Sequence, residues 1–186
     1  MAGNQMPTPD VTRFPIETRY QSALNAMRNP GFLKTPKYQQ QQKRALTEGA
    51  HPHIVEFARK IVKRFHSMGV PMFPHCIVRT EQEQQSAFDA GVSWDSPTDG
   101  LWPHKFGAVD IIHGTLAWMD RPYIPHAWQI VGHVGQEVAL SMGIKIVWGG
   151  DFSPKKYDPA HFDLANWKQI ATTGDKYWSP NHQASA

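Results

Sequence analysis

The segment from residue 148 to residue 164 constrains the fold and function of this chain most strongly. It follows a short apolar run and concentrates glycines, prolines, three aspartates and one histidine. Asp158 and His161 lie three residues apart, and Pro159 between them disfavours helical geometry at Asp158. We therefore expect a rigid polar loop in which a carboxylate and an imidazole face a common space, as a metal site that activates water requires.

A second stretch reads as a glycine bend at Gly107 that feeds a β-strand. Alternate side chains of a strand share a face, so Val109 and Ile111 are expected on one face and Asp110 on the other. A carboxylate within an apolar strand is costly to bury unless a cation compensates it. His104 would join Asp110 at one metal ion only if the chain folds back at the glycine, which permits such a bend.

Several motifs support a metal site when they are taken together. The chain contains Trp102-Pro-His-Lys-Phe-Gly-Ala-Val-Asp110, then Trp148-Gly-Gly-Asp151, then Asp158-Pro-Ala-His161. Upstream, Arg79 is followed by Thr and by a Gln-containing stretch. In this order the motifs resemble those of the M15-type zinc peptidases, the D-Ala-D-Ala carboxypeptidases and L-alanyl-D-glutamate endopeptidases of bacteria and phages. The resemblance covers the part of the chain from residue 53 to residue 170.

This resemblance implies an α+β fold, a small antiparallel sheet flanked by helices as in Hedgehog and D-Ala-D-Ala peptidases, with zinc as cofactor. It implies metal binding by His104, Asp110 and His161, which leaves a coordination position open for water. Asp158 would accept the proton of the attacking water, and Arg79 would hold the substrate or the developing oxyanion. Candidates for further substrate contacts are Gln84, Trp148 and Asp151.

The implied function is hydrolysis of a peptide bond in the stem peptides of bacterial peptidoglycan. The resemblance leaves L-Ala-D-Glu endopeptidase and D-Ala-D-Ala carboxypeptidase activity open. Two departures from the family pattern favour an alternative, a non-catalytic wall-binding or virion structural module on the same fold. Trp102 stands where the family has a serine, and the interval from His104 to Asp110 is one residue shorter than usual.

Other polar residues are weaker candidates for the site. His113 has the opposite strand parity to Asp110, so we expect a structural or supporting role for it. His133 and Glu137 lie one helical turn apart but match no zinc motif, and we expect an ordinary pair on a helix flank. Cys76, the only cysteine of the chain, lies in an apolar run and is expected to be a small buried hydrophobic residue.

Hydrophobic periodicity predicts helices over 53–68, 81–90, 125–142 and 165–171, and strands over 70–78, 108–112 and 144–148. The glycine-bounded connector 91–100 is either one wall of a cleft or a surface loop.

Three parts of the chain are expected: an N-terminal extension over 1–50, a peptidase domain over 51–172 and a C-terminal tail over 173–186. The extension is polar and proline-spaced, and a short helix is expected near residues 16–27. Either it is loosely packed or it serves as a docking arm for another protein.

The net charge of +3 is mild, and the basic residues form no stripe. We therefore expect no nucleic-acid binding. No apolar segment is long enough to span a bilayer, and the N-terminus lacks the features of a signal peptide. We expect a cytoplasmic product at synthesis that reaches the wall after release or within a virion, with a virion or holin-type partner for delivery.

Overall fold

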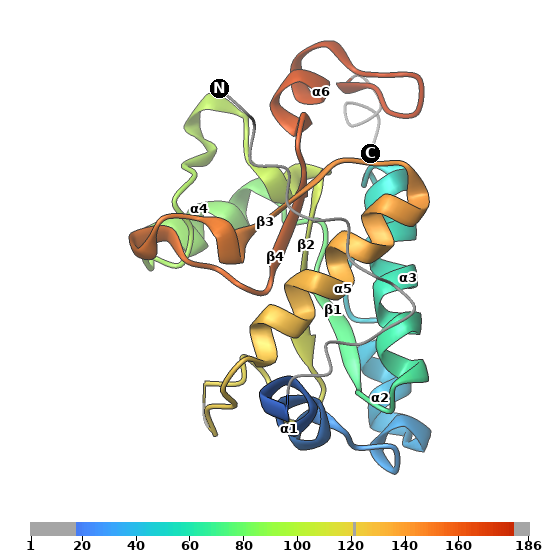
Figure 1. Ribbon diagram of the computed structural model, residues 1–186. Coiled ribbons are helices and arrows are strands. Elements are labelled where there is room, and N and C mark those ends of the chain that lie inside the picture. The colour runs from blue at the N-terminus through green and yellow to red at the C-terminus, as the bar shows by residue number, and fades with distance from the viewer. Residues whose placement is uncertain (1–17, 121, 181–186) are drawn as a thin grey trace, which may run out of the picture.

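The computed structural model describes residues 18–120 and 122–180 (Figure 1). Its helices are α1 Thr18–Met27, α2 Pro36–Gln41, α3 Pro52–Ser67, α4 Glu81–Asp89, α5 Ala127–Met142 and α6 Trp167–Thr173. Its strands are β1 Met72–Cys76, β2 Ala108–His113, β3 Ile146–Trp148 and β4 His161–Leu164. They form a 4-stranded antiparallel sheet in the order β1-β2-β4-β3. The expected α+β class, a small antiparallel sheet flanked by helices, is confirmed.

Most elements overlap the segments that the periodicity predicts, but α2 has no predicted counterpart, and two further differences have a structural reason. α5 begins at Ala127 rather than at Pro125, because His126 adopts a left-handed backbone conformation (φ 67°) just before it. β4 was missed, since the whole segment from 148 to 164 was interpreted as a loop. A strand of 4 residues carries little periodicity of its own, and only its pairing with both β2 and β3 defines it.

The long helices α3 and α5 lie side by side against the sheet (Figure 1). Phe57 of α3 meets Phe162 of β4 with their ring centroids 5.3 Å apart. Glycines on α5 allow the helix to approach the sheet closely: a Cβ atom at Gly132 would lie 2.6 Å from the Trp148 ring, and one at Gly135 would overlap the Phe162 ring. Both helices therefore pack on the same face of the sheet.

Alternation along the central strands divides the sheet into an apolar face and a polar face. Val109 and Ile111 of β2 are buried in the main core, as is Phe162 of β4. Asp110 has the opposite parity on β2, and His161 lies directly across from it on β4. The expected parity of β2 is confirmed, and the same alternation in β4 places a histidine beside the aspartate on the polar face.

The N-terminal region packs on the domain more closely than the sequence suggested. In α1, Ala23, Leu24 and Met27 are buried and belong to the main core. His113, at the end of β2, ties this helix down through a contact of 2.8 Å between its Nε2 atom and the Met27 carbonyl oxygen. Loose packing is therefore wrong for residues 18–50. The short helix expected near residues 16–27 is present as α1, which begins at Thr18. Residues 1–17 lie outside the described part of the chain.

The C-terminal region also contacts the domain. The Trp178 ring stacks on Phe106 with the ring centroids 3.9 Å apart, and its indole nitrogen donates to the Gly49 carbonyl oxygen at 2.8 Å. Tyr177, next to it, remains largely exposed. The division of the chain at residues 50 and 172 stays a prediction.

Among the described residues, no helix combines the length and the apolar character that crossing a membrane demands.

We expect Trp178→Ala to lower the free energy of unfolding by about 3–5 kcal/mol, as for other buried aromatic residues cut back to alanine. Tyr177→Ala is the matched control, and its loss should stay near ~1 kcal/mol because the exposed Tyr177 ring makes only edge or tilted contacts with the His51 and His53 rings. Urea denaturation of both variants measures the difference. Equal losses would show that the C-terminal segment is not anchored through Trp178.

Candidate metal centre

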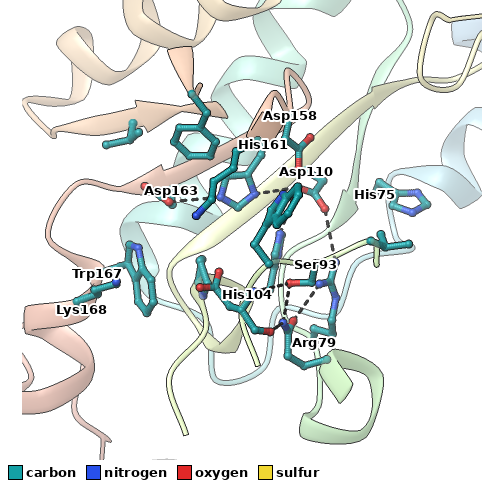
Figure 2. A pocket seen from close by; sticks show the side chains of 18 of the residues that line it. His75, Arg79, Ser93, His104, Asp110, Asp158, His161, Asp163, Trp167 and Lys168 are labelled. Carbon is teal, nitrogen blue, oxygen red and sulfur yellow. Dashed lines mark hydrogen bonds and ion pairs between the residues drawn. The ribbon is translucent and has the colours of Figure 1, made fainter. Parts of the chain in front are cut away.

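Three potential metal ligands meet on the polar face of the sheet (Figure 2). The Oδ1 atom of Asp110 lies 3.2 Å from Nε2 of His104 and 3.1 Å from Nδ1 of His161. All three side chains are buried. Asp110 and His161 come from adjacent strands, whereas His104 comes from the turn that precedes β2. The structure thus brings together the residues that the motifs single out as ligands.

The outer nitrogen of each imidazole faces a hydrogen-bond acceptor. Nδ1 of His104 lies 3.1 Å from the Ile77 carbonyl oxygen, and Nε2 of His161 lies 3.3 Å from Oδ2 of Asp163. Because those partners only accept, the outer nitrogen would carry the proton of a neutral ring. The inner nitrogens would then present lone pairs to Asp110, which also only accepts, so that either a further proton on each ring or a cation must lie between them. Outer acceptors of this kind are typical supporting groups of metal-bound histidines.

The pKa values of the three side chains also indicate that the cluster lacks positive charge. Burial disfavours the charged form of both imidazoles, but the charge of Asp110 and its hydrogen bonds outweigh burial and raise the pKa of His104 to about 10 and that of His161 to about 9. Burial would raise the pKa of Asp110, yet the imidazoles hold that pKa well below its usual value. Without an ion, protons on the imidazoles supply the charge that the site demands.

The turn before β2 explains how His104 reaches Asp110. Pro103–Lys105 forms a 3₁₀ turn, and the Gly107 amide closes it by donating to the Pro103 carbonyl oxygen at 2.9 Å. The chain therefore folds back at the glycine, as expected. The short interval between the two ligands still brings them into contact.

The turn between β3 and β4 places Asp158 beside the same cluster. One oxygen of Asp158 lies within 4.8 Å of donor atoms of both Asp110 and His161. The loop is tight at its start, because a Cβ atom on Gly149 would overlap the Asp158 carbonyl group and one on Gly150 would overlap the Trp148 ring. The glycine pair of the Trp-Gly-Gly-Asp motif thus permits the loop geometry that brings Asp158 to the site. Burial, and next the charge of Asp110, raise the pKa of Asp158.

Arg79 is held at the edge of the cluster by several contacts. Its Nη2 atom lies 3.8 Å from Oδ2 of Asp110, and its Nη1 atom donates to Oε1 of the buried Gln84 at 2.9 Å. Its backbone carbonyl accepts a hydrogen bond from the Trp102 indole at 3.1 Å, and its amide donates to the His104 carbonyl oxygen at 2.7 Å. Trp102 therefore fixes the backbone of Arg79.

An open cavity of about 600 Å³ surrounds these groups. The connector 91–100 forms one wall through Trp94 and its neighbours, and Lys156 on the β3–β4 loop reaches over the Trp94 ring at 5.8 Å. Trp167 and Lys168 lie on the other side of the cavity from His75 (Figure 2). Of the two possibilities for the connector, the cleft wall is therefore confirmed.

Other residues that the sequence selected lie away from the cluster. Neither Trp148 nor Asp151 lines the cavity: the Trp148 indole donates to the Pro159 carbonyl oxygen at 2.8 Å, and Asp151 is exposed in a 3₁₀ turn. Both ring nitrogens of His113 contact backbone groups, which confirms a structural role. Glu137 pairs with Arg64 of α3 at 2.9 Å, as expected for a residue on a helix flank.

The sequence did not single out three residues that belong to the site. Asp163 supports His161, and Ser93 accepts from Gln84 at 2.8 Å. Cys76 was expected to be a buried hydrophobic residue, but it is partly exposed, and its sulfur lies within 4.8 Å of donor atoms of His104 and Asp110. Alternation in β4 would have pointed to Asp163 had that strand been recognised. No local pattern identifies the other two, because both depend on pairing across the fold.

The fold is similar to that of a solved structure, although no protein-family model and no curated protein matches the sequence. The crystal structure of L-Ala D-Glu endopeptidase ChiX from Serratia marcescens is similar, with a TM-score of 0.52 and 21% sequence identity over 73% of this chain and 91% of that chain. At this level of identity, the similarity shows a common fold.

The raised histidine pKa values predict a pH-dependent stability of the metal-free protein. Their contribution is fully present below pH 6.5, the usual histidine pKa, and is lost as the pH rises towards 9 and 10. The melting temperature of chelator-treated protein should fall across this window, and it should fall less with a divalent cation bound, because the ion replaces the protons. Chelator-treated Asp110→Asn, without the carboxylate that raises both values, is the control. If the melting temperatures of the wild type and of this variant fell equally with pH, Asp110 would not be the cause of the raised histidine pKa values.

Proposed function

We propose that this chain is a zinc-dependent peptidase that cleaves stem peptides of bacterial peptidoglycan. The observation that carries this proposal is the convergence of His104, Asp110 and His161 in an open cavity, with Asp158 and Arg79 at its edge. The motifs that resemble the M15-type peptidases consist largely of these same residues. The sequence motifs and the distances between side chains therefore support the same cluster.

Zinc suits the donor set. Two imidazoles and one carboxylate are typical zinc ligands, and catalytic zinc sites keep a further position open. When bound, zinc would polarise a carbonyl group and lower the pKa of water towards neutrality. The roles of His104, Asp110 and His161 are to hold the ion, while Ile77 and Asp163 fix the orientation of the two rings.

Asp158 is the proposed general base. Its carboxylate lies beside the cluster, and its raised pKa strengthens it as a proton acceptor compared with an exposed aspartate. In the reaction it takes the proton of the attacking water and passes it to the leaving amine. Asp110, with its pKa held low, is too weak a base for this role and serves as a ligand.

Arg79 is the proposed anchor for negative charge. A guanidinium at the cavity wall can bind a substrate carboxylate or the oxyanion that develops during hydrolysis. Gln84 and Trp102 hold its side chain and its backbone respectively, so the charge is positioned before the substrate arrives. In this proposal Gln84 acts through Arg79, and Trp148 and Asp151 have no part.

Basic side chains in the cavity offer contacts for the carboxylates of a stem peptide. The lining includes Arg79, Lys156 and Lys168 as well as four aspartates, three of which belong to or support the metal cluster. The solved structure with a similar fold is described as an L-Ala D-Glu endopeptidase. By analogy of fold, we favour cleavage between L-Ala and D-Glu over carboxypeptidase action on D-Ala-D-Ala. Delivery by a virion or a holin-type partner, and the absence of nucleic-acid binding, stay predictions.

Digestion of purified peptidoglycan tests the function. After incubation with zinc-loaded protein, mass spectrometry of the muropeptides should detect peptides that begin with D-Glu, together with glycan strands that retain L-Ala. Release of single D-Ala residues would assign the carboxypeptidase reaction instead. Unchanged muropeptides in the presence of bound zinc would favour the non-catalytic wall-binding or virion module.

We expect Asp158→Asn to lower the hydrolysis rate by about 10²-fold or more, because the proton acceptor is lost. The variant should keep one zinc per chain, measured by atomic absorption. Asp89→Asn, an exposed position on α4 outside the cavity, is the matched control and should keep both properties. Loss of zinc from Asp158→Asn would reassign Asp158 as a ligand.

A further inference from the structure

A row of potential metal donors crosses the sheet at the level of Asp110. Cys76 on β1 pairs with Asp110 on β2, and Asp110 pairs with His161 on β4. Residues directly opposite in an antiparallel pair project from the same face, and neighbouring strands lie about 4.8 Å apart. The Asp110 carboxylate is therefore flanked by an imidazole on one side and by a thiol on the other.

An irregularity in β1 gives the cysteine this position. Pro74 pairs with Ile111, and the next pair along the strands is Cys76 with Asp110, so that His75 is the extra residue of a β-bulge. In a regular ladder His75 would lie opposite Asp110. Bulges re-aim side chains and are frequent next to active sites. Here the bulge brings a sulfur atom to the polar face beside Asp110.

The donor atoms form overlapping clusters that share Asp110. One comprises Asp110, Asp158 and His161; the other comprises Cys76, His104 and Asp110, and the donor atoms within each lie within 4.8 Å of one another. The proposed function assigns a role to every member except Cys76. The sulfur makes a long contact of 4.0 Å to the Val78 carbonyl oxygen and also interacts with the His104 imidazole, and the residue is partly exposed. It is thus available to a cation beside the buried His104 and Asp110.

We propose that Cys76 is a ligand of a cation that it holds together with His104 and Asp110, the two residues with which its sulfur clusters. Thiolate is a soft donor that suits zinc and binds it at about 2.3 Å, a distance close to that of imidazole. On binding, the thiol would release its proton to solvent and Cys76 would hold the ion as a thiolate. A site closed by protein ligands is structural rather than catalytic. A cysteine ligand would therefore make the site more closed than two imidazoles and one carboxylate do.

Cobalt spectroscopy tests this proposal, which rests on the metal centre of the proposed function. A thiolate bound to Co²⁺ gives an intense near-ultraviolet charge-transfer band, whereas nitrogen and oxygen ligands give only weak visible bands. Cys76 is the only cysteine in the chain, so such a band has a single possible source. We expect one Co²⁺ per wild-type chain with the sulfur band, and one Co²⁺ per Cys76→Ser chain with the visible bands alone.

Thiol labelling provides a second readout that does not depend on the variant folding. In wild-type protein, bound zinc should slow alkylation of Cys76 at least tenfold relative to chelator-treated protein. Visible cobalt bands without the sulfur band, or equal alkylation rates with and without zinc, would overturn the role of Cys76 and leave the peptidase proposal intact. A wild-type protein that binds no cobalt would remove the metal centre itself and both proposals with it.

Discussion

The buried carboxylate of Asp110 is the constraint on which the rest of the site depends. It lies in the middle of an apolar strand, where an unpaired charge would strongly destabilise the fold. Two imidazoles contact its Oδ1 atom, while their outer nitrogens face other acceptors. The polar face of this sheet therefore requires positive charge beside Asp110. Protons on the two imidazoles can supply that charge, but they make the stability of the protein depend on pH. A divalent cation supplies it more completely.

The scaffold around Asp110 is organised to hold its partners rigidly. The apolar face of the sheet is fixed by α3 and α5, and glycines on α5 allow the helix to rest directly on the Trp148 and Phe162 rings. Because β4 is clamped in this way, His161 and Asp163 on its opposite face have little freedom. Core packing on one side of the sheet thus determines the geometry of the donors on the other.

The two departures from the M15-type pattern have structural explanations. The shorter interval before Asp110 is absorbed by the 3₁₀ turn at Pro103–Lys105, which still presents the His104 imidazole to the carboxylate. Trp102, in place of serine, donates its indole hydrogen to the backbone of Arg79. With both changes present, His104 still contacts Asp110, and Arg79 still lies beside it.

By itself, the sequence determined the helical segments and the parity of β2, since periodicity and alternation are local properties. The fold class and the candidate donors His104, Asp110 and His161 came from the resemblance of its motifs to those of the M15-type peptidases. Only the tertiary structure decided which further groups join them. β4 is too short to be recognised before it pairs, and with it Asp163 was missed. The place of Cys76 depends on a bulge in the pairing of β1 with β2. The packing of α1 depends on contacts with core residues that are distant in sequence. Each of these features arises from contacts between segments remote in sequence, which no local pattern encodes.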